Sequence, residues 1–186
     1  MSPHQFDAKD KAHLKNENRM KVQPVEGILE RAEVRRDEVC ADLGCGIGYL
    51  SVPLAIRCQA VVAVDSQKEM LTTLWSSLSE FARSNVYLVQ AQVDRLPFSA
   101  PSFDHVFLVN VLHEVEDRDR LAEEVERVLR PGGRMTVVDF QKKPTSFGPP
   151  VEERLTAEEA EACFNSVRLE KRHSLDEFYQ LEMIRL

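Results

Sequence analysis

The chain has 186 residues, of which 43% are hydrophobic, and its formal net charge is −7 at pH 7. This length and apolar content predict one domain, residues 1–186, with a single core. The negative charge and the lack of a Lys/Arg block argue against nonspecific binding to nucleic-acid backbones or anionic membranes, so we expect no nucleic-acid partner.

No apolar run approaches the ~20 residues that span a bilayer, and we expect no membrane insertion. The four cysteines, Cys40, Cys45, Cys58 and Cys163, include no Cys-x-x-Cys pair and follow no secretory signal. We therefore expect reduced thiols, no metal site and a cytoplasmic location.

The first 37 residues are polar and weakly periodic as far as Pro24. Apolar residues then recur at helical spacing from Val25 to Ala32 and predict a short helix. The segment before it has too few apolar residues to form a core by itself. Residues 1–23 are expected to be either a flexible segment or a lid that closes over a ligand and excludes water.

An apolar run with an acidic residue, Asp42, breaks into alternating glycines in the segment 39–49, VCADLGCGIGY. This pattern predicts a strand, a tight turn and a helix. Glycines at alternate positions permit φ > 0 and let a ligand approach main-chain amides at the positive end of the next helix. We expect a nucleotide-like ligand here, and an ordinary βα turn is the alternative.

The spacing of these glycines excludes the dinucleotide fingerprint Gly-x-Gly-x-x-Gly, because the third glycine position holds Tyr49 in one phase and Ser51 in the other. The sequence Asp-x-Gly-x-Gly-x-Gly instead resembles the first motif of the class I S-adenosylmethionine-dependent methyltransferases. A carboxylate at Asp42 would attract the cationic methionyl end of that ligand, whereas it would repel a pyrophosphate.

A short helix over 50–56 and a buried strand over 60–64 follow, and the strand ends in Asp65. An acidic residue about twenty positions beyond the glycines can accept hydrogen bonds from both ribose hydroxyls. The alternative is that Asp65, together with Ser66, caps the helix predicted over 67–81.

A third strand is predicted over 86–89, and the segment after it lies where the resembled family holds adenine. By this resemblance, Gln92 supplies a polar side chain near the exocyclic amine and Val93 supplies a backbone amide. The family often has Asp where this chain has Gln92, and an amide oxygen can still accept from an amino group.

The fourth strand, predicted over 102–110, ends at Asn110, whose carbonyl or side chain is expected to meet the amino group of the ligand. Asn110 is not followed by two prolines and an aromatic residue, so the motif of amino-directed nucleic-acid methyltransferases is absent. His113 and Glu114 form the titratable pair nearest the expected methyl position. His113 is a candidate general base, and a residue at the wet edge of the cleft is the alternative.

Five further segments complete the chain. The Leu-Arg-Pro-Gly-Gly turn at residues 129–133 resembles the family. The linker over 140–155 is the best candidate for the wall of the acceptor site. The predicted elements are a helix over 118–129, a strand over 134–139 after that turn, the linker 140–155, a helix over 156–164 with a capping box at Thr156 and Glu159, and an antiparallel hairpin of strands over 167–173 and 178–185.

The resemblance extends from about residue 24 to the end. Through Leu96-Pro97-Phe98 and Phe103-Asp104, it is closest to the ubiquinone and menaquinone biosynthesis methyltransferases. It implies an α/β fold, a Rossmann-like seven-stranded sheet in the order 3-2-1-4-5-7-6, mostly parallel with the last strand antiparallel and helices on both faces. The residues that it assigns to S-adenosylmethionine are Asp42, Gly44, Cys45, Gly46, Asp65, Ser66, Gln92, Val93 and Asn110.

The resemblance implies direct methyl displacement onto an acceptor, which we expect to be a small molecule. The alternative is a module that binds S-adenosylmethionine or S-adenosylhomocysteine without transferring the methyl group. A dehydrogenase is disfavoured by Tyr49. The identity of the acceptor, the oligomeric state and the catalytic residues, apart from the candidate His113, are left open.

Overall fold

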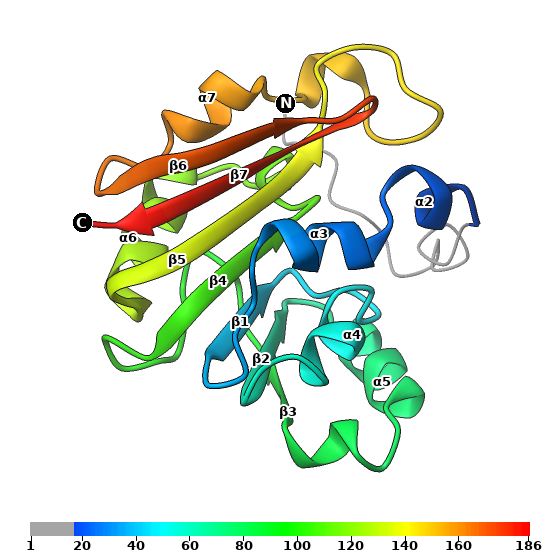
Figure 1. Ribbon diagram of the computed structural model, residues 1–186, viewed down its shortest axis with the longest axis vertical. Helices are drawn as coiled ribbons and strands as arrows, with labels where there is room; N and C mark the ends of the chain where they lie inside the picture. Colours follow the sequence, from blue (N-terminus) through cyan, green and yellow to red (C-terminus); the bar gives the residue numbers. More distant parts are fainter. Residues whose placement is uncertain (1–16) are drawn as a thin grey trace.

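The computed structural model describes residues 17–186. Seven strands of this part of the chain form one sheet in the order β3-β2-β1-β4-β5-β7-β6 (Figure 1), as predicted. β7 is antiparallel to both β5 and β6, and the remaining pairs are parallel. The strands are β1 (Val39–Leu43), β2 (Ala60–Asp65), β3 (Val86–Gln90), β4 (Phe103–Val109), β5 (Leu129–Phe140), β6 (Val167–Ser174) and β7 (Phe178–Arg185).

Helices cover both faces of the sheet. Ile28, Leu54 and Leu74 belong to the core on one face, and Leu121 and Ala160 belong to the core on the other. Within residues 17–186, no helix has both the length and the apolar character needed to cross a membrane. The helices are α2 (Glu17–Val22), α3 (Val25–Arg31), α4 (Ser51–Ala55), α5 (Lys68–Ser77), α6 (Arg118–Val128) and α7 (Ala157–Glu161), with short 3-10 turns η2 (Ala82–Ser84), η3 (Leu112–Glu114) and η4 (Val151–Glu153).

The central strands are apolar on both faces because both faces are covered. In β1, Cys40 belongs to the core beneath α3, α4 and α5, whereas Ala41 and Leu43 belong to the core beneath α6 and α7. The parallel strands β2, β1, β4 and β5 all end at the same edge of the sheet. Ligands of open α/β sheets bind beyond this edge, so the candidate functional site is expected there.

Helix α5 is shorter than the predicted helix over 67–81. It ends at Ser77, and Leu78 adopts an extended backbone with φ −70° and ψ 131°. The hydroxyl group of Ser77 donates to the carbonyl of Leu74, a local hydrogen bond of the kind that competes with helix continuation. Phe81, at the end of the predicted helix, lies outside α5 and is 64% exposed.

β5 begins five residues earlier than predicted. Leu129 pairs with Phe103 and Arg134 pairs with His105, so β5 carries extra residues opposite β4 and forms an irregular bulge. Gly132 lies in this bulge with φ +72°, a conformation that glycine adopts at little cost. The predicted turn is therefore part of the strand.

Helix α7 has the predicted capping box, in which the Thr156 hydroxyl accepts from the Glu159 N–H and the Glu159 carboxylate accepts from the Thr156 N–H. The helix ends at Glu161, three residues before the predicted end at Phe164.

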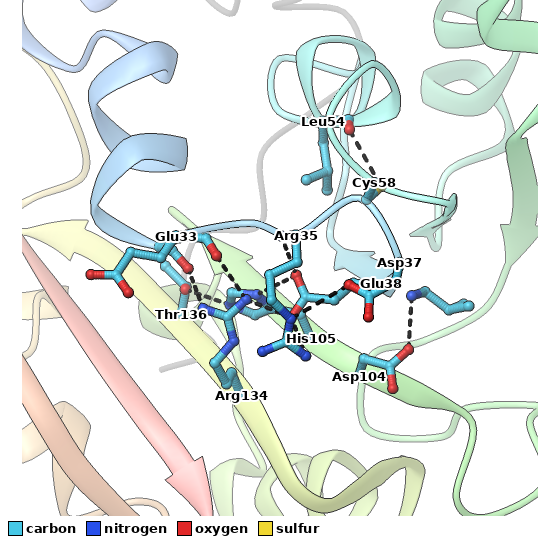
Figure 2. A network of polar contacts seen from close by, with 12 residues as sticks. Glu33, Arg35, Asp37, Glu38, Leu54, Cys58, Asp104, His105, Arg134 and Thr136 are labelled. Carbon is cyan, nitrogen blue, oxygen red and sulfur yellow. Dashed lines mark hydrogen bonds and ion pairs between the residues drawn. The ribbon is translucent and has the colours of Figure 1, made fainter.

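A buried polar network lies at the opposite edge of the sheet, where β1 and β4 begin (Figure 2). Glu38 is 1% exposed and accepts hydrogen bonds from the Arg35 N–H at 2.8 Å and from Nη2 of Arg134 at 2.5 Å. Nε2 of the fully buried His105 lies 2.8 Å from Oγ1 of Thr136, and its Nδ1 lies 3.8 Å from Oε2 of Glu38. This network joins the start of the sheet to β5, far along the strands from their carboxyl ends.

Candidate functional site

The glycine turn after β1 brings main-chain amides to the carboxyl edge of the sheet. The N–H groups of Gly44 and Cys45 both donate to the carbonyl of Val64, at 2.8 and 2.9 Å, and so fix the turn against the end of β2. Gly44 has φ +74°, and a Cβ atom there would lie 2.5 Å from Cγ2 of Val111. A side chain at position 44 would therefore be strained and would clash, which explains the glycine.

Asp42 lies directly below this turn and is 2% exposed. Its Oδ2 accepts a hydrogen bond from the hydroxyl of Ser51 at 2.5 Å. Burial raises the pKa of Asp42 to about 6, and the nearby Asp65 also raises it, whereas Ser51 and Arg19 lower it. The interactions with Ser51 and Arg19 do not fully offset the loss of hydration of this carboxylate, so a bound cation would be stabilised beside it.

Asp65 ends β2 and connects the glycine turn to α5. Its Oδ2 accepts from the Gly46 N–H and its Oδ1 accepts from the Gln67 N–H, both at 2.9 Å. Burial raises the pKa of this carboxyl. Because each oxygen receives one of these hydrogen bonds, lone pairs remain that can accept from a vicinal diol.

Asp65 is not the N-cap residue of α5, although its carboxylate accepts a hydrogen bond at the start of that helix. The N-cap residue of α5 is Gln67, which makes no side-chain capping bond, and Asp65 bonds to its amide instead. Ser66 is half-buried between these two residues.

The residues after β3 adjoin the end of β2. Gln90 is the register partner of Asp65, and the N–H of Ala91 donates to the Asp65 carbonyl at 3.2 Å. Gln92 is exposed and Val93 is half-buried in the turn that follows. The structure therefore brings both residues to the edge that carries Asp42 and Asp65.

Asn110 follows β4 and has a left-handed backbone, with φ +58°. Its side chain forms two hydrogen bonds with the side chain of Gln23: Nε2 of Gln23 donates to Oδ1, and Nδ2 of Asn110 donates to Oε1, each at 3.0 Å. The amide that the sequence assigned to the ligand is thus bonded to a residue 87 positions earlier in the chain.

A cluster that the sequence did not reveal lies around Gln23. Arg19 is 7% exposed, its guanidinium lies 3.9 Å from the centre of the Tyr49 ring, and its Nε donates to Oε1 of Gln23 at 3.2 Å. The Tyr49 hydroxyl donates to the Gln23 carbonyl. Arg19, Gln23, Tyr49 and Asn110 come from three distant segments, and no sequence pattern joins them.

His113 lies in η3, beyond the end of β4, and is 4% exposed. Its Nδ1 lies 2.7 Å from Oδ1 of Asp139, and its backbone N–H donates to Oδ2 of the same carboxylate at 3.2 Å. Burial acts to lower the pKa of His113, but the charge and hydrogen bond of Asp139 outweigh it, so the pKa is raised. Nε2 lies 3.7 Å from Oε1 of Glu114.

Asp139 was not among the residues that the sequence assigned to the site. The available signal was its position, because β5, like β2, carries an aspartate close to its carboxyl end. A carboxylate and an imidazole in this arrangement fix the orientation of the ring and favour the tautomer with the proton on Nδ1.

The linker over 140–155 packs against this dyad and is held by Arg154, which is 4% exposed. Arg154 donates to the carbonyls of Pro149, Gln141 and Lys143 and lies over the ring of Phe140. These contacts give the linker a defined shape.

A cavity of about 470 Å³ adjoins the start of the linker. Tyr179, one of its lining residues, is the register partner of Asp139 across β5 and β7. The cavity is also lined by Gln141, Lys142, Lys143, Thr156, Ala157, Glu158, Arg172 and Ser174. In residues 17–186, no three His, Cys, Asp or Glu side chains are grouped closely enough to hold a metal ion.

The carboxyl edge fits a ligand that has a cationic end and a sugar. Asp42 offers a desolvated carboxylate, Asp65 offers acceptor oxygens, and the turn between them presents backbone without a Cβ at Gly44. A pyrophosphate would place negative charge next to both buried carboxylates, which is unfavourable.

Comparison with known proteins identifies relatives of this chain. The model of the methyltransferase domain family matches residues 41–137. An uncharacterized methyltransferase of Bacillus subtilis, YcgJ, is 31% identical over 112 residues, which are 60% of this chain and 44% of that protein. The ubiquinone/menaquinone biosynthesis C-methyltransferase UbiE of Hahella chejuensis is 34% identical over 118 residues, 61% of this chain and 47% of UbiE.

The chain thus matches less than half the length of these curated relatives. The crystal structure of a SAM-dependent methyltransferase from Aquifex aeolicus has the same fold, with a TM-score of 0.88 at 21% identity, covering 98% of this chain and 100% of that one.

Proposed function

Because the chain belongs to the methyltransferase domain family, whose cofactor is S-adenosylmethionine, we propose that it transfers the methyl group of S-adenosylmethionine to a small-molecule acceptor. The observation that carries this proposal is the pair of buried carboxylates, Asp42 and Asp65, on adjacent strands. The turn between them is tied to Asp65 through the Gly46 N–H.

Each donor-site residue has a role that follows from its position. Asp42 attracts the cationic methionyl end, and Asp65 accepts from the ribose hydroxyls. The remaining residues line the donor: Gly44, Cys45 and Gly46 at the turn, Ser66, Gln92 and Val93 on the adenine side, and Asn110 through its carbonyl at the methionyl end.

S-adenosylmethionine supplies a methyl group that is already activated by its sulfonium. The protein therefore has to orient the acceptor and exclude water, and such alignment contributes up to roughly 7–11 kcal/mol in well-oriented reactions. We propose that residues 1–23 contribute to closure, since Arg19 and Gln23 contact Tyr49 and Asn110 beside the glycine turn. Residues 1–16 lie outside the described part of the chain.

His113 is the proposed general base for an acceptor that must lose a proton. Asp139 holds the ring through Nδ1, which leaves Nε2 as the nitrogen that can accept the proton. The raised pKa of His113 makes it a stronger base than an isolated histidine, although the ring is neutral only above that pKa.

The linker over 140–155 is the proposed acceptor wall. Arg154 fixes its course, and Phe140, Phe147 and Phe178 pack as an aromatic cluster beside His113. One relative is named for ubiquinone and menaquinone biosynthesis, which is a reason to include quinone precursors among the acceptors tested.

Two measurements test the proposal. Calorimetry should show binding of S-adenosylmethionine and S-adenosylhomocysteine but not of nicotinamide dinucleotides. With a panel of small phenols, quinols and amines, the release of S-adenosylhomocysteine should depend on the acceptor. Failure to bind either adenosyl compound would refute the donor site, whereas binding without turnover on any acceptor would favour a module that only binds the cofactor.

A further inference from the structure

Arg19 carries a buried positive charge that the protein itself compensates poorly. The side chain is 7% exposed, yet within residues 17–186 its one hydrogen bond runs from Nε to Oε1 of Gln23, a neutral amide. The two Nη groups have no hydrogen-bond partner among these residues. Burial lowers the pKa of Arg19 to about 10, which indicates that nearby carboxylates do not fully offset the loss of hydration.

The position of this guanidinium is fixed by Tyr49 and Gln23. It stacks on the ring of Tyr49, at 3.9 Å from the ring centre, and Tyr49 belongs to the glycine turn. The Tyr49 hydroxyl and the side chain of Asn110 both bond to Gln23, the residue that accepts from Arg19. Arg19 is therefore held beside the turn and beside the end of β4, although it comes from α2.

The charge of Asp42 raises the pKa of the Arg19 guanidinium, and Arg19 lowers the pKa of Asp42. No ion pair between them is formed within salt-bridge distance, and Oδ2 of Asp42 is bonded to Ser51. The two opposite charges thus lie near each other without neutralising each other directly. This arrangement complements a ligand that carries both an ammonium and a carboxylate group.

Resting on the proposed function, we infer that Arg19 binds the α-carboxylate of the methionyl end of S-adenosylmethionine through its Nη groups, while Asp42 serves the adjacent ammonium. Arginine suits this role because its planar fork matches a carboxylate and its charge is kept when it is buried. A carboxylate partner also supplies the hydrogen-bond acceptors that the buried guanidinium lacks.

The test separates the carboxylate from the rest of the ligand. Calorimetry compares S-adenosylmethionine with decarboxylated S-adenosylmethionine, which keeps the sulfonium and the ammonium, for the wild-type chain and for Arg19→Met. The wild type should prefer S-adenosylmethionine by about 10- to 100-fold, the usual range for one charge-assisted contact. In Arg19→Met this preference should disappear, while the affinity for the decarboxylated compound stays within about threefold.

Arg83→Met is the matched control, since Arg83 also lies over an aromatic ring, that of Trp75, but at η2 beyond α5. It should keep the full preference. If Arg19→Met weakened both ligands equally, or neither, the assignment of Arg19 to the carboxylate would be overturned. If the wild type bound neither ligand, the proposed function would be lost together with this inference.

Discussion

The carboxylate of Asp139 holds His113 at two points, with Oδ1 at 2.7 Å from Nδ1 and Oδ2 at 3.2 Å from the backbone N–H. One side chain therefore fixes both the backbone position and the ring orientation of the histidine. Such a dyad has a definite signature in the pH dependence of the reaction.

For His113, we expect kcat to increase with pH through an inflection above 6.5, because the ring acts as a base only when it is neutral and its folded pKa is raised. Asp139→Asn should move this inflection to lower pH and reduce kcat. His113→Gln should reduce kcat by roughly 10²- to 10⁴-fold with unchanged S-adenosylmethionine affinity. A flat pH profile in the wild type, with full activity in His113→Gln, would exclude this role.

For Asp65, replacement by Ala should weaken S-adenosylmethionine binding by about 1.5–3 kcal/mol, the usual contribution of a charge-assisted hydrogen bond. Calorimetry on folded protein measures the change. Asp176→Ala is the control, since that side chain is 93% exposed at the β6–β7 turn and should leave the affinity unchanged. Equal affinities for the two variants would remove Asp65 from the site.

For the glycine turn, Gly44→Ala and Gly132→Ala form a matched pair. Both positions have left-handed φ, +74° and +72°, so both variants should lose about 1–2 kcal/mol of stability from backbone strain. Only at Gly44 would the new Cβ meet another side chain, that of Val111, which adds roughly 1–3 kcal/mol. Urea denaturation should show this difference, and only Gly44→Ala should bind the donor more weakly.

For His105, we expect a contribution to acid sensitivity that is unrelated to activity (Figure 2). Burial lowers its pKa to about 4, so the unfolded chain takes up a proton near pH 6.5 that the folded chain does not take up until about pH 4. The contribution of His105 to the free energy of unfolding should therefore fall by about 3 kcal/mol as the pH falls across this window.

His105→Gln removes this titration. The raised pKa of Asp42 acts in the opposite direction, but it is common to both proteins and cancels in the difference between wild type and variant. Urea titrations at pH 7, 5.5 and 4.5 should show the wild type losing its stability advantage over His105→Gln as the pH falls. A difference that does not vary with pH would contradict the assignment.

The sequence alone predicted the order of the sheet, through resemblance to a family, and the approximate position of each strand. The strands could be predicted because the central strands are covered on both faces and are therefore continuous apolar runs, each flanked by polar turns. Several predicted ends were wrong because local interactions set them. The predicted helix continued to Phe81, but α5 ends at Ser77. The predicted strand began at residue 134, but β5 begins at Leu129 and includes a glycine-containing bulge.

The candidate donor-site residues, in contrast, were predicted from the spacing of short motifs. Asp42, Gly44, Gly46 and Asp65 lie in two short segments at the ends of adjacent strands, and their spacing along the chain carries the information. Their roles toward the ligand remain proposals, but the structure brings all four to one edge of the sheet.

What only the tertiary structure decided is which distant residues meet at that edge. His113 and Asp139 are 26 positions apart, and Gln23 and Asn110 are 87 apart. Such pairs depend on how crossovers and the N-terminal helices fold back over the strand ends, and no local spacing specifies that. The sequence by itself therefore determined the sheet and the glycine turn, whereas long-range packing determined the partner of the histidine and the buried position of Arg19.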